Sequence, residues 1–412
     1  MTNSFPNLNF NRRRRGPLPI VIGILVVASI ALVSLSGFYA DWLWFKSVDF
    51  TEVWSTILLT KATVFVIAGL ATSLVITLNV YIAFRKRPLY VPLTSEADNL
   101  ERYRSQIEPI RRLVLVGLAL VLFYFGGSSA SQLWDTWLLF RNATPFGVTD
   151  PQFGLDISFF AFKLPMYQAL VGWAISTLVF AIIGSAIVHY LYGGIRPQVA
   201  QERTTVAARV QLSVLLGLVV LLKAVAYWLD RYALALKENR LITGLTYTDV
   251  NALLPAKAIL AGIAVICSLL FFANIVRKSW LLPAAGTALL VVSSVLIAGI
   301  YPAAIQQFQV KPSESSKEAP FIQRNIDATR DAFGLSGVEV KDFQATLNAS
   351  AGQLSKNAAT IANIRLMDPN VLSPTFRQLK QISRTTHLHQ LSMLIAIKLM
   401  AFLTTQSWLF AN

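Results

Sequence analysis

The stretch ILLTKATVFVIAGLATSLVITLNVYIAF, residues 57–84, carries one charged side chain, Lys61, in 28 positions. The hydrocarbon core of a bilayer is about 30 Å thick, so a helix of about 20 apolar residues is long enough to cross it. In hydrocarbon the backbone must satisfy its own hydrogen bonds, which an α-helix does within one segment. We therefore predict a membrane-spanning helix here.

Six further stretches share this length and composition, and together they predict an all-α transmembrane bundle over residues 18–305, after a basic tail at 1–17. The seven predicted spans are Leu18–Ala40, Ile57–Phe84, Leu113–Ser131, Met166–Leu191, Val210–Leu229, Leu253–Val276 and Leu281–Ile305. Only 14% of the 412 residues are charged, against about 25% in a soluble protein. The first stretch is too long for a cleaved signal core, so we interpret it as a retained span.

The basic residues alternate from loop to loop. Sixteen Lys and Arg lie in one set of loops, with the amino-terminal run Arg12–Arg15, and six lie in the other set. The positive-inside rule places the richer set in the cytoplasm. We expect a bacterial plasma-membrane protein with a cytoplasmic amino terminus and an extracytoplasmic region after Ile305. The net charge of +15 is thus explained by loops, and we expect no nucleic-acid partner.

No residue pattern predicts catalysis, a cofactor or a metal. Because Cys267 is the sequence's one cysteine, no intrachain disulfide is possible. It lies inside a span and is interpreted as a core residue. His189 ends the fourth span, and we assign it no function, while His387 and His389 lack further ligands. The Gly126-Gly127 pair is interpreted as a kink or a close helix contact.

Four lysines are candidates for a site in the outer leaflet: Lys61, Lys163, Lys223 and Lys257. Intramembrane lysines are functional candidates by default, and an anionic lipid or polyprenyl-phosphate headgroup would suit them. Two alternatives stay open. The amines can reach the headgroup layer along their flexible stems, or they can pair with Asp41, Asp156 or Asp230.

The loop Gln132–Pro165 is rich in aromatic residues. Asp150-Pro151 predicts a helix start, with the aspartate as cap and the proline at the first position. Two interpretations remain open: one or two helices in the outer interface or against the bundle, or a folded loop over the spans.

After Ile305 the chain becomes polar. We expect a linker at 306–319 and the start of a soluble α+β domain at 320–382. Its predicted helices are Pro320–Phe333 and Ser373–Ile382, and its predicted strands are Val338–Phe343 and Asn363–Met367.

Several runs resemble a bacterial membrane protein family known as uncharacterised protein family 0182. They are TDPQFGLDISFFAFKLP at 149–165, YTDVN at 247–251, PFIQRNIDATR at 320–330 and NIRLMDP at 363–369. The resemblance covers Leu18–Ile382 and implies seven amino-terminal spans followed by a large extracytoplasmic domain. The family has no assigned activity, so the resemblance implies no catalytic residues.

The tail 383–412 departs from that resemblance, and we interpret it as an aberrant end produced by truncation or a frameshift near Ser383. Its apolar part, Ser392–Phe410, carries Lys398 near the centre, which costs about 2.5–3.5 kcal/mol on insertion scales. We therefore predict no eighth span.

Three classes of function compete. We favour a membrane protein that anchors an extracytoplasmic domain, with a role in envelope or lipid-related assembly. A transporter or channel is the alternative, although the span centres carry few ionisable groups. A lipid-modifying enzyme ranks last, because no set of acid, base or metal ligands is visible.

Overall fold

The computed structural model describes residues 18–88, 101, 103–197, 203–239, 242–277 and 281–342. Contacts divide the chain into two compact units, Met1–Ser336 and Gly337–Asn412. The helices are α1 (Leu18–Ser47), α2 (Thr51–Arg85), η1 (Glu108–Ile110), α4 (Arg111–Ser131), α5 (Trp134–Arg141), η2 (Phe159–Lys163), α6 (Leu164–Leu191), α7 (Val206–Ala233), η3 (Leu234–Leu236), η4 (Asp249–Leu253), α8 (Leu254–Arg277), α9 (Leu281–Ser293), η5 (Ser294–Ile300), α10 (Tyr301–Ile305), η6 (Gln306–Val310), η7 (Lys311–Ser313) and α11 (Glu314–Ala332).

Six helical segments of the described chain are long and apolar enough to cross a membrane: Thr51–Arg85, Tyr103–Ser131, Phe159–Leu191, Val206–Leu236, Asp249–Arg277 and Leu281–Ala332. They contain the last six predicted spans, which confirms those positions. The first predicted span forms α1, a helix of 30 residues, and its crossing of the membrane stays a prediction.

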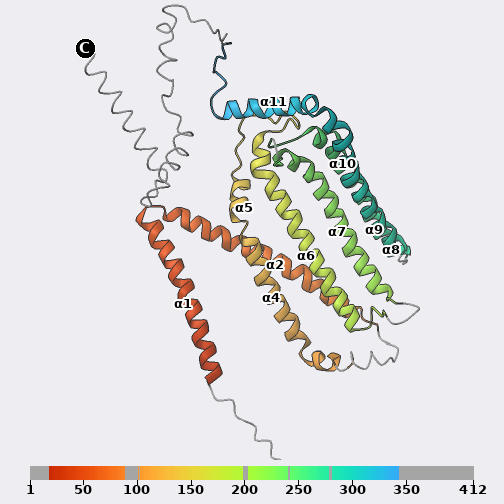
Figure 1. The fold of residues 1–412 in the computed structure, drawn as a ribbon. Helices are drawn as coiled ribbons and strands as arrows, with labels where there is room; N and C mark the ends of the chain where they lie inside the picture. Colours follow the sequence, from red (N-terminus) through yellow and green to blue (C-terminus); the bar gives the residue numbers. More distant parts are fainter. Residues whose placement is uncertain are drawn as a thin grey trace, which may run out of the picture. The chain divides into compact units, whose positions relative to one another are not determined.

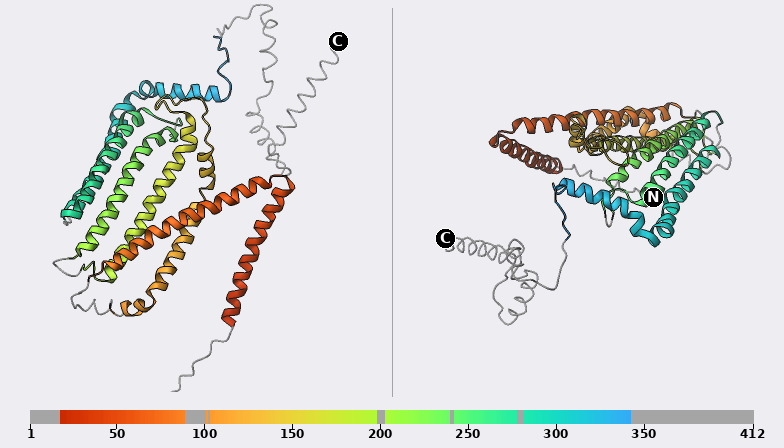
Figure 2. Two further views of the ribbon diagram at one scale, coloured as in Figure 1. Left: turned by 180° about the vertical axis from the view of Figure 1, so that it is seen from behind. Right: turned by 90° about the horizontal axis from the view of Figure 1, so that it is seen from above.

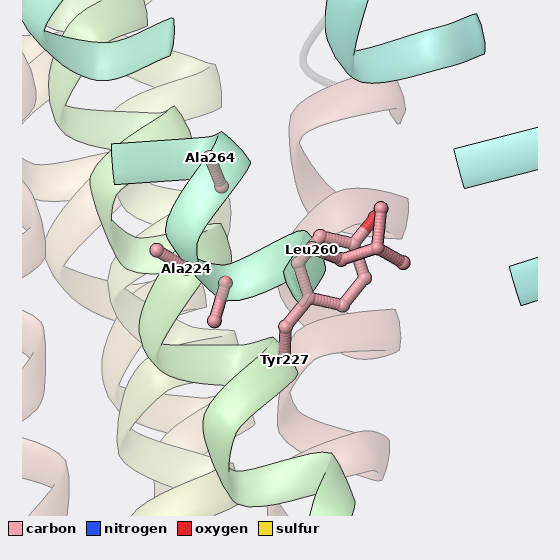
Figure 3. Packing of buried hydrophobic residues seen from close by; sticks show 5 residues of the cluster. Ala224, Tyr227, Leu260 and Ala264 are labelled. Atoms are coloured by element: carbon pink, nitrogen blue, oxygen red, sulfur yellow. The ribbon is translucent and has the colours of Figure 1, made fainter. Parts of the chain in front are cut away.

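The spans stand in a row rather than around a central axis (Figures 1 and 2). The neighbours in the row are α4, α2, α6, α7, α8 and α9, in that order. Between 11% and 39% of the most apolar stretch of each span is buried inside the described chain, so most of this apolar surface is left uncovered by the chain itself. Between α7 and α8 the buried cluster consists of Ala224, Tyr227, Leu260, Ala261 and Ala264 (Figure 3).

Polar side chains connect neighbouring helices of this row. Ser73 of α2 donates to the carbonyl of Ala119 in α4 at 2.8 Å, and Trp173 of α6 donates to Thr72 of α2 at 3.1 Å. Ser268 of α8 donates to the carbonyl of Gly217 in α7 at 2.9 Å. In a lipid environment such bonds and close packing hold helices together, because apolar burial alone distinguishes poorly between protein and lipid.

Helices α2 and α4 are in close contact, because glycines let the two backbones approach. A Cβ added at Gly127 would lie 2.6 Å from the Phe65 carbonyl oxygen, and one added at Gly69 would lie 2.6 Å from that of Phe123. A Cβ added at Gly126 would lie 2.8 Å from the Cβ of Thr72. The predicted helix contact at Gly126-Gly127 is therefore confirmed.

Replacing Gly127 by leucine should separate α2 from α4. The backbone oxygen of Phe65 cannot move aside as a flexible side chain would, and overpacking typically costs about 1–3 kcal/mol. We expect a lower thermal unfolding midpoint in detergent. Gly117→Leu is the control, since nothing lies within 4 Å of its added Cβ on the same helix. Equal midpoints for the two variants would contradict this packing.

Four π-helical turns interrupt the helices of the described residues, and each precedes a proline. In each one, the N–H of the residue before the proline bonds to the carbonyl five residues back: Leu164 to Phe159, Leu254 to Asp249, Tyr301 to Leu296 and Lys311 to Gln306. A proline has no N–H to donate and its ring crowds the preceding turn. The wider turn accommodates the ring without ending the helix.

One consequence is that the segment expected as a linker, 306–319, is helical. The helical run continues from Leu281 to Ala332 over 52 residues, which at about 1.5 Å per residue far exceeds a bilayer core. Figure 1 shows α9 and α10 beside α8, whereas α11 lies across the ends of the spans. Pro312 and Pro320 thus lie within a continuing helical run and do not end it.

The loop 132–165 contains one short helix, α5, and then a turn where we expected a helix start. Asp150 does act as a cap, accepting from the N–H groups of Gln152 and Phe153, but only a turn follows. The helix starts after Asp156, which accepts from the N–H of Ser158 at 2.8 Å. The predicted start was therefore placed too early, at the first of two capping aspartates.

The predicted α+β domain is not supported. The described part of Val338–Phe343, residues 338–342, forms no strand, and the described chain holds only isolated bridges. Residues 320–332 of the predicted helix Pro320–Phe333 are part of α11, which starts earlier, at Glu314, and belongs to the first compact unit. The strand predicted at Asn363–Met367, the helix at Ser373–Ile382 and the tail 383–412 lie outside the described residues.

Candidate functional site

The structure brings two of the four candidate lysines together. The ammonium groups of Lys223 in α7 and Lys257 in α8 lie 5.0 Å and 5.5 Å from the ring centre of Tyr227. Lys257 also pairs with Asp230 at 2.8 Å, so one of the pairings we left open is present. A cation over an aromatic face is attracted by the ring quadrupole. Tyr227 therefore holds both amines at one place between α7 and α8.

The other two lysines lie elsewhere in the row. Lys61 of α2 has its ammonium group 5.3 Å from the ring centre of Trp134 in α5. Lys163 is the last residue of η2 and is exposed. The structure thus divides the four lysines between different helices, and only Lys223 and Lys257 share a contact residue.

A buried polar network, which the sequence analysis did not assign, connects α2, α6 and α7. Gln211 of α7 donates through Nε2 to the backbone carbonyl of Asn79 at 2.8 Å and to Ser185 Oγ at 3.3 Å. Its Oε1 lies 3.0 Å from Nε2 of His189. His189 and Ser185 are almost completely buried.

The bond to Asn79 fixes the proton on His189. A backbone carbonyl can only accept, so the Gln211 amide nitrogen faces Asn79 and its oxygen faces the imidazole. That oxygen also can only accept, so the His189 Nε2 must donate. The other ring nitrogen, Nδ1, is buried and has no hydrogen-bond partner within the described part of the chain. His189 is therefore part of the packing between α6 and α7.

The buried acidic side chains at the other end of the spans serve as caps. Asp249, fully buried, accepts from Lys237 Nζ at 2.8 Å and from Thr246 N and Oγ1 at 3.0 Å and 2.7 Å. Glu318 of α11 accepts from the N–H of Tyr247 at 3.0 Å. These bonds hold the loop before α8 against α11.

Asp156 has a similar role in the loop before α6. Hydrogen bonds from the side chain and backbone of Ser158, and then from Phe146 and Gly147, lower the pKa of Asp156 from 3.8 to about 2. A lowered folded-state pKa means that this carboxylate stabilises the fold fully above its ordinary pKa. The contribution is lost as the pH falls through about 2.

A helical protein with six apolar segments of spanning length is a multi-pass membrane protein. The chain belongs to the Uncharacterised protein family (UPF0182), whose sequence model matches residues 18–392. The match extends past Ile382, where we expected the resemblance to end.

Curated relatives agree with this assignment. UPF0182 proteins of Streptomyces coelicolor and Nocardioides are 46% and 45% identical over 90% and 92% of this chain, and each alignment covers 38% of the relative. A UPF0182 protein of Thermobifida fusca is 46% identical over 90% of this chain and 36% of its own. The chain thus spans less than two fifths of the length of these relatives. No solved structure matches the chain.

Among the described residues, no group of three or more His, Cys, Asp or Glu is placed to hold a metal ion. The four-residue network around Gln211 was missed because each member is a single polar residue inside an apolar stretch. An isolated glutamine in a predicted span is itself a signal, since polar side chains in lipid usually find partners on other helices.

Replacing Gln211 by leucine should destabilise the contact of α2, α6 and α7. Ser185 and His189 would lose a partner while staying buried, which costs about 1–3 kcal/mol. Thermal unfolding in detergent measures the effect. Gln323→Leu on α11 makes the same chemical change at an exposed position whose side chain bonds to Asp327. If Gln211→Leu unfolds no earlier than Gln323→Leu, the network does not hold these helices.

Proposed function

We propose that the chain is the membrane anchor of a longer envelope protein in the bacterial plasma membrane. Its amino terminus lies in the cytoplasm, and the residues after α11 are extracytoplasmic. Helix α1 also crosses the membrane, which brings the number of spans to seven. The observation that supports this proposal is the path of the last helical run, Leu281–Ala332. At the end of the spans away from the amino-terminal end of α4, it turns and continues as α11 across the span ends (Figure 1).

Polar contacts fasten α11 at that end. Asn325 donates to the carbonyl of Thr243 at 3.0 Å, and Arg324 donates to Gln152 at 3.3 Å. Together with the bond from Tyr247 N to Glu318, these contacts give the following residues a fixed starting point. The greater length of the relatives supports an anchoring role, because a large further region would then begin here.

Anchoring accounts for these acids better than catalysis does. The buried Asp249 and Glu318 accept backbone N–H bonds, and the partly exposed Asp156 accepts the backbone N–H of Ser158. Such carboxylates are occupied in holding backbone rather than poised to transfer a proton. We therefore rank an enzyme behind an anchor.

A cysteine-labelling experiment tests the orientation. In a Cys267→Ala background, Ser336→Cys should react with a membrane-impermeant maleimide added to intact spheroplasts. Lys86→Cys, at the end of α2, should react only after permeabilisation. Labelling of Ser336→Cys only after permeabilisation would reverse the proposed topology, and the parent protein with buried Cys267 serves as the blank.

A transporter is the second candidate, and the buried network around Gln211 favours it. Polar residues facing the interior of a helix assembly can line a substrate path. Solute flux into proteoliposomes that Gln211→Leu abolishes, without loss of folded protein, would favour transport over anchoring.

We also propose that the outer-leaflet site for an anionic lipid or polyprenyl-phosphate headgroup is centred on Lys223 and Lys257. The support is their common contact with Tyr227 and the exposure of Lys223. Asp230 already neutralises part of the charge at Lys257, so Lys223 carries the larger share of the attraction. Lys61 and Lys163 belong to other surfaces and would bind a headgroup separately.

Neutralising both lysines should remove the lipid. We expect the Lys223→Gln/Lys257→Gln variant to co-purify with far less anionic lipid than the native protein, because each charge attracts the headgroup by about 1 kcal/mol. Lipid extraction and mass spectrometry measure the content. Lys46→Gln, an exposed lysine at the end of α1, is the control, and an unchanged content in the double variant would remove the idea.

A further inference from the structure

Three arginines surround a pair of aromatic rings where α2 ends, α4 begins and α6 ends. The rings of Phe84 and Tyr192 meet edge to face at 5.1 Å. The guanidinium of Arg87 lies 4.4 Å from the Phe84 ring centre and 5.4 Å from that of Tyr192. Arg111 lies 5.4 Å from Phe84, and Arg104 lies 5.8 Å from Tyr192. The end of α2 and the residues up to the start of α4 thus bring three positive charges to the end of the distant helix α6.

Arg104 is the least exposed of the three, with only 9% of its surface accessible. Its Nε donates to the carbonyl of Leu191, the last residue of α6, at 2.6 Å. Its Nη1 lies 3.5 Å from the largely exposed carboxylate of Glu101. Its Nη2 is buried and has no hydrogen-bond partner among the residues that the structure describes. A charged donor that is buried and unpaired is costly, so an acceptor from outside the chain would satisfy it.

In the described part of the chain, the two carboxylates paired with these arginines, those of Glu101 and Glu108, do not balance the three positive charges. One oxygen of Glu108 serves both Arg87, at 3.0 Å, and Arg111, at 3.7 Å. Both arginines stay partly exposed, with 35% and 47% of their side chains accessible. Each guanidinium has five N–H donors in a planar fork that suits phosphate oxygens. A shallow, open depression lined by Glu108, Pro109, Arg111 and Arg112 lies beside them.

The charged residues of this cluster also affect the pKa of Tyr192, the residue that follows the end of α6. Burial raises the pKa of the Tyr192 phenol, and the nearby Glu108 raises it further. Arg87, Arg104 and Arg111 act in the opposite direction. The phenol therefore stays protonated at neutral pH, and its neutral ring face is available to the guanidinium groups.

We propose that Arg87, Arg104 and Arg111 bind the phosphate of an anionic phospholipid headgroup, with the unpaired Nη2 of Arg104 as one donor. The position of the cluster selects the source of the phosphate. The span of α2 ends at Arg85, that of α4 begins at Arg111 and that of α6 ends at Leu191. This is the level at which the helices leave the hydrocarbon, where lipid phosphates lie. The site lies at the opposite end of the spans from Lys223 and Lys257, so it does not depend on the lysine proposal.

The test uses the purified full chain in detergent with a short-chain phosphatidylglycerol, a short-chain phosphatidylcholine and inorganic phosphate as separate additives. Phosphatidylglycerol should raise the thermal unfolding midpoint in a saturable way, whereas phosphatidylcholine and inorganic phosphate should not. Arg87→Gln and Arg111→Gln should each weaken half-saturation roughly tenfold, the effect of losing one charged hydrogen bond. These two arginines are partly exposed, so both variants should fold even if Arg104→Gln does not.

Arg277→Gln is the matched control, because Arg277 is an exposed arginine at the carboxyl end of α8, at the same end of the spans as the three arginines. It should keep the native response to phosphatidylglycerol. An equal loss in Arg277→Gln would show diffuse attraction to basic residues and would overturn the site. An absent response in the native chain would overturn it too. An equal response to inorganic phosphate would reassign the site to a soluble phosphate compound and overturn the assignment to lipid.

Discussion

A polar side chain inside the hydrocarbon layer has to find its partners within the protein, and Gln211 shows what this requirement does to the fold. Its amide reaches α2 through Asn79 and α6 through Ser185 and His189. In water each group could exchange these bonds for bonds to solvent, whereas in lipid that exchange is costly. The rotation of three helices about their axes is thus constrained by one glutamine.

Glycine contacts supply the complementary constraint. Between α2 and α4 the backbones approach until no side chain fits at Gly69 or Gly127, which increases dispersion contact where apolar burial gives little preference. Elsewhere in the row a few hydroxyl and amide bonds suffice, such as that from Asn274 to Ser213 at 2.7 Å. The result is a row of helices with broad apolar faces left to lipid.

The sequence predicted those features that depend on composition alone. A stretch of about 20 apolar residues nearly suffices to define a span, so six predicted positions were confirmed. Features that depend on how helices face each other were not predicted: the network around Gln211 and the gathering of arginines at Phe84 and Tyr192. Local sequence signals for the ends and starts of helices were also misleading. The polar composition after Ile305 suggested a linker, yet the helical run continues through it, and Asp150 suggested a helix start that belongs to Asp156. For the lysine site, the residues were predicted from the sequence. Which aromatic ring each lysine contacts, Tyr227 for Lys223 and Lys257 and Trp134 for Lys61, depends on the packing of the helices.

The order of helices in the row has a consequence for biosynthesis. Most neighbours in space are also neighbours along the chain, since α6 follows α5 and then packs on α7, α7 on α8 and α8 on α9. Each such hairpin can assemble as soon as its second helix enters the bilayer from the translocon. The exception is α2, which pairs with α4 and must keep its other side open until α6 arrives. Nascent chains halted before Leu164 would therefore present that side of α2, with Thr72 and Asn79, to lipid or to an insertion chaperone.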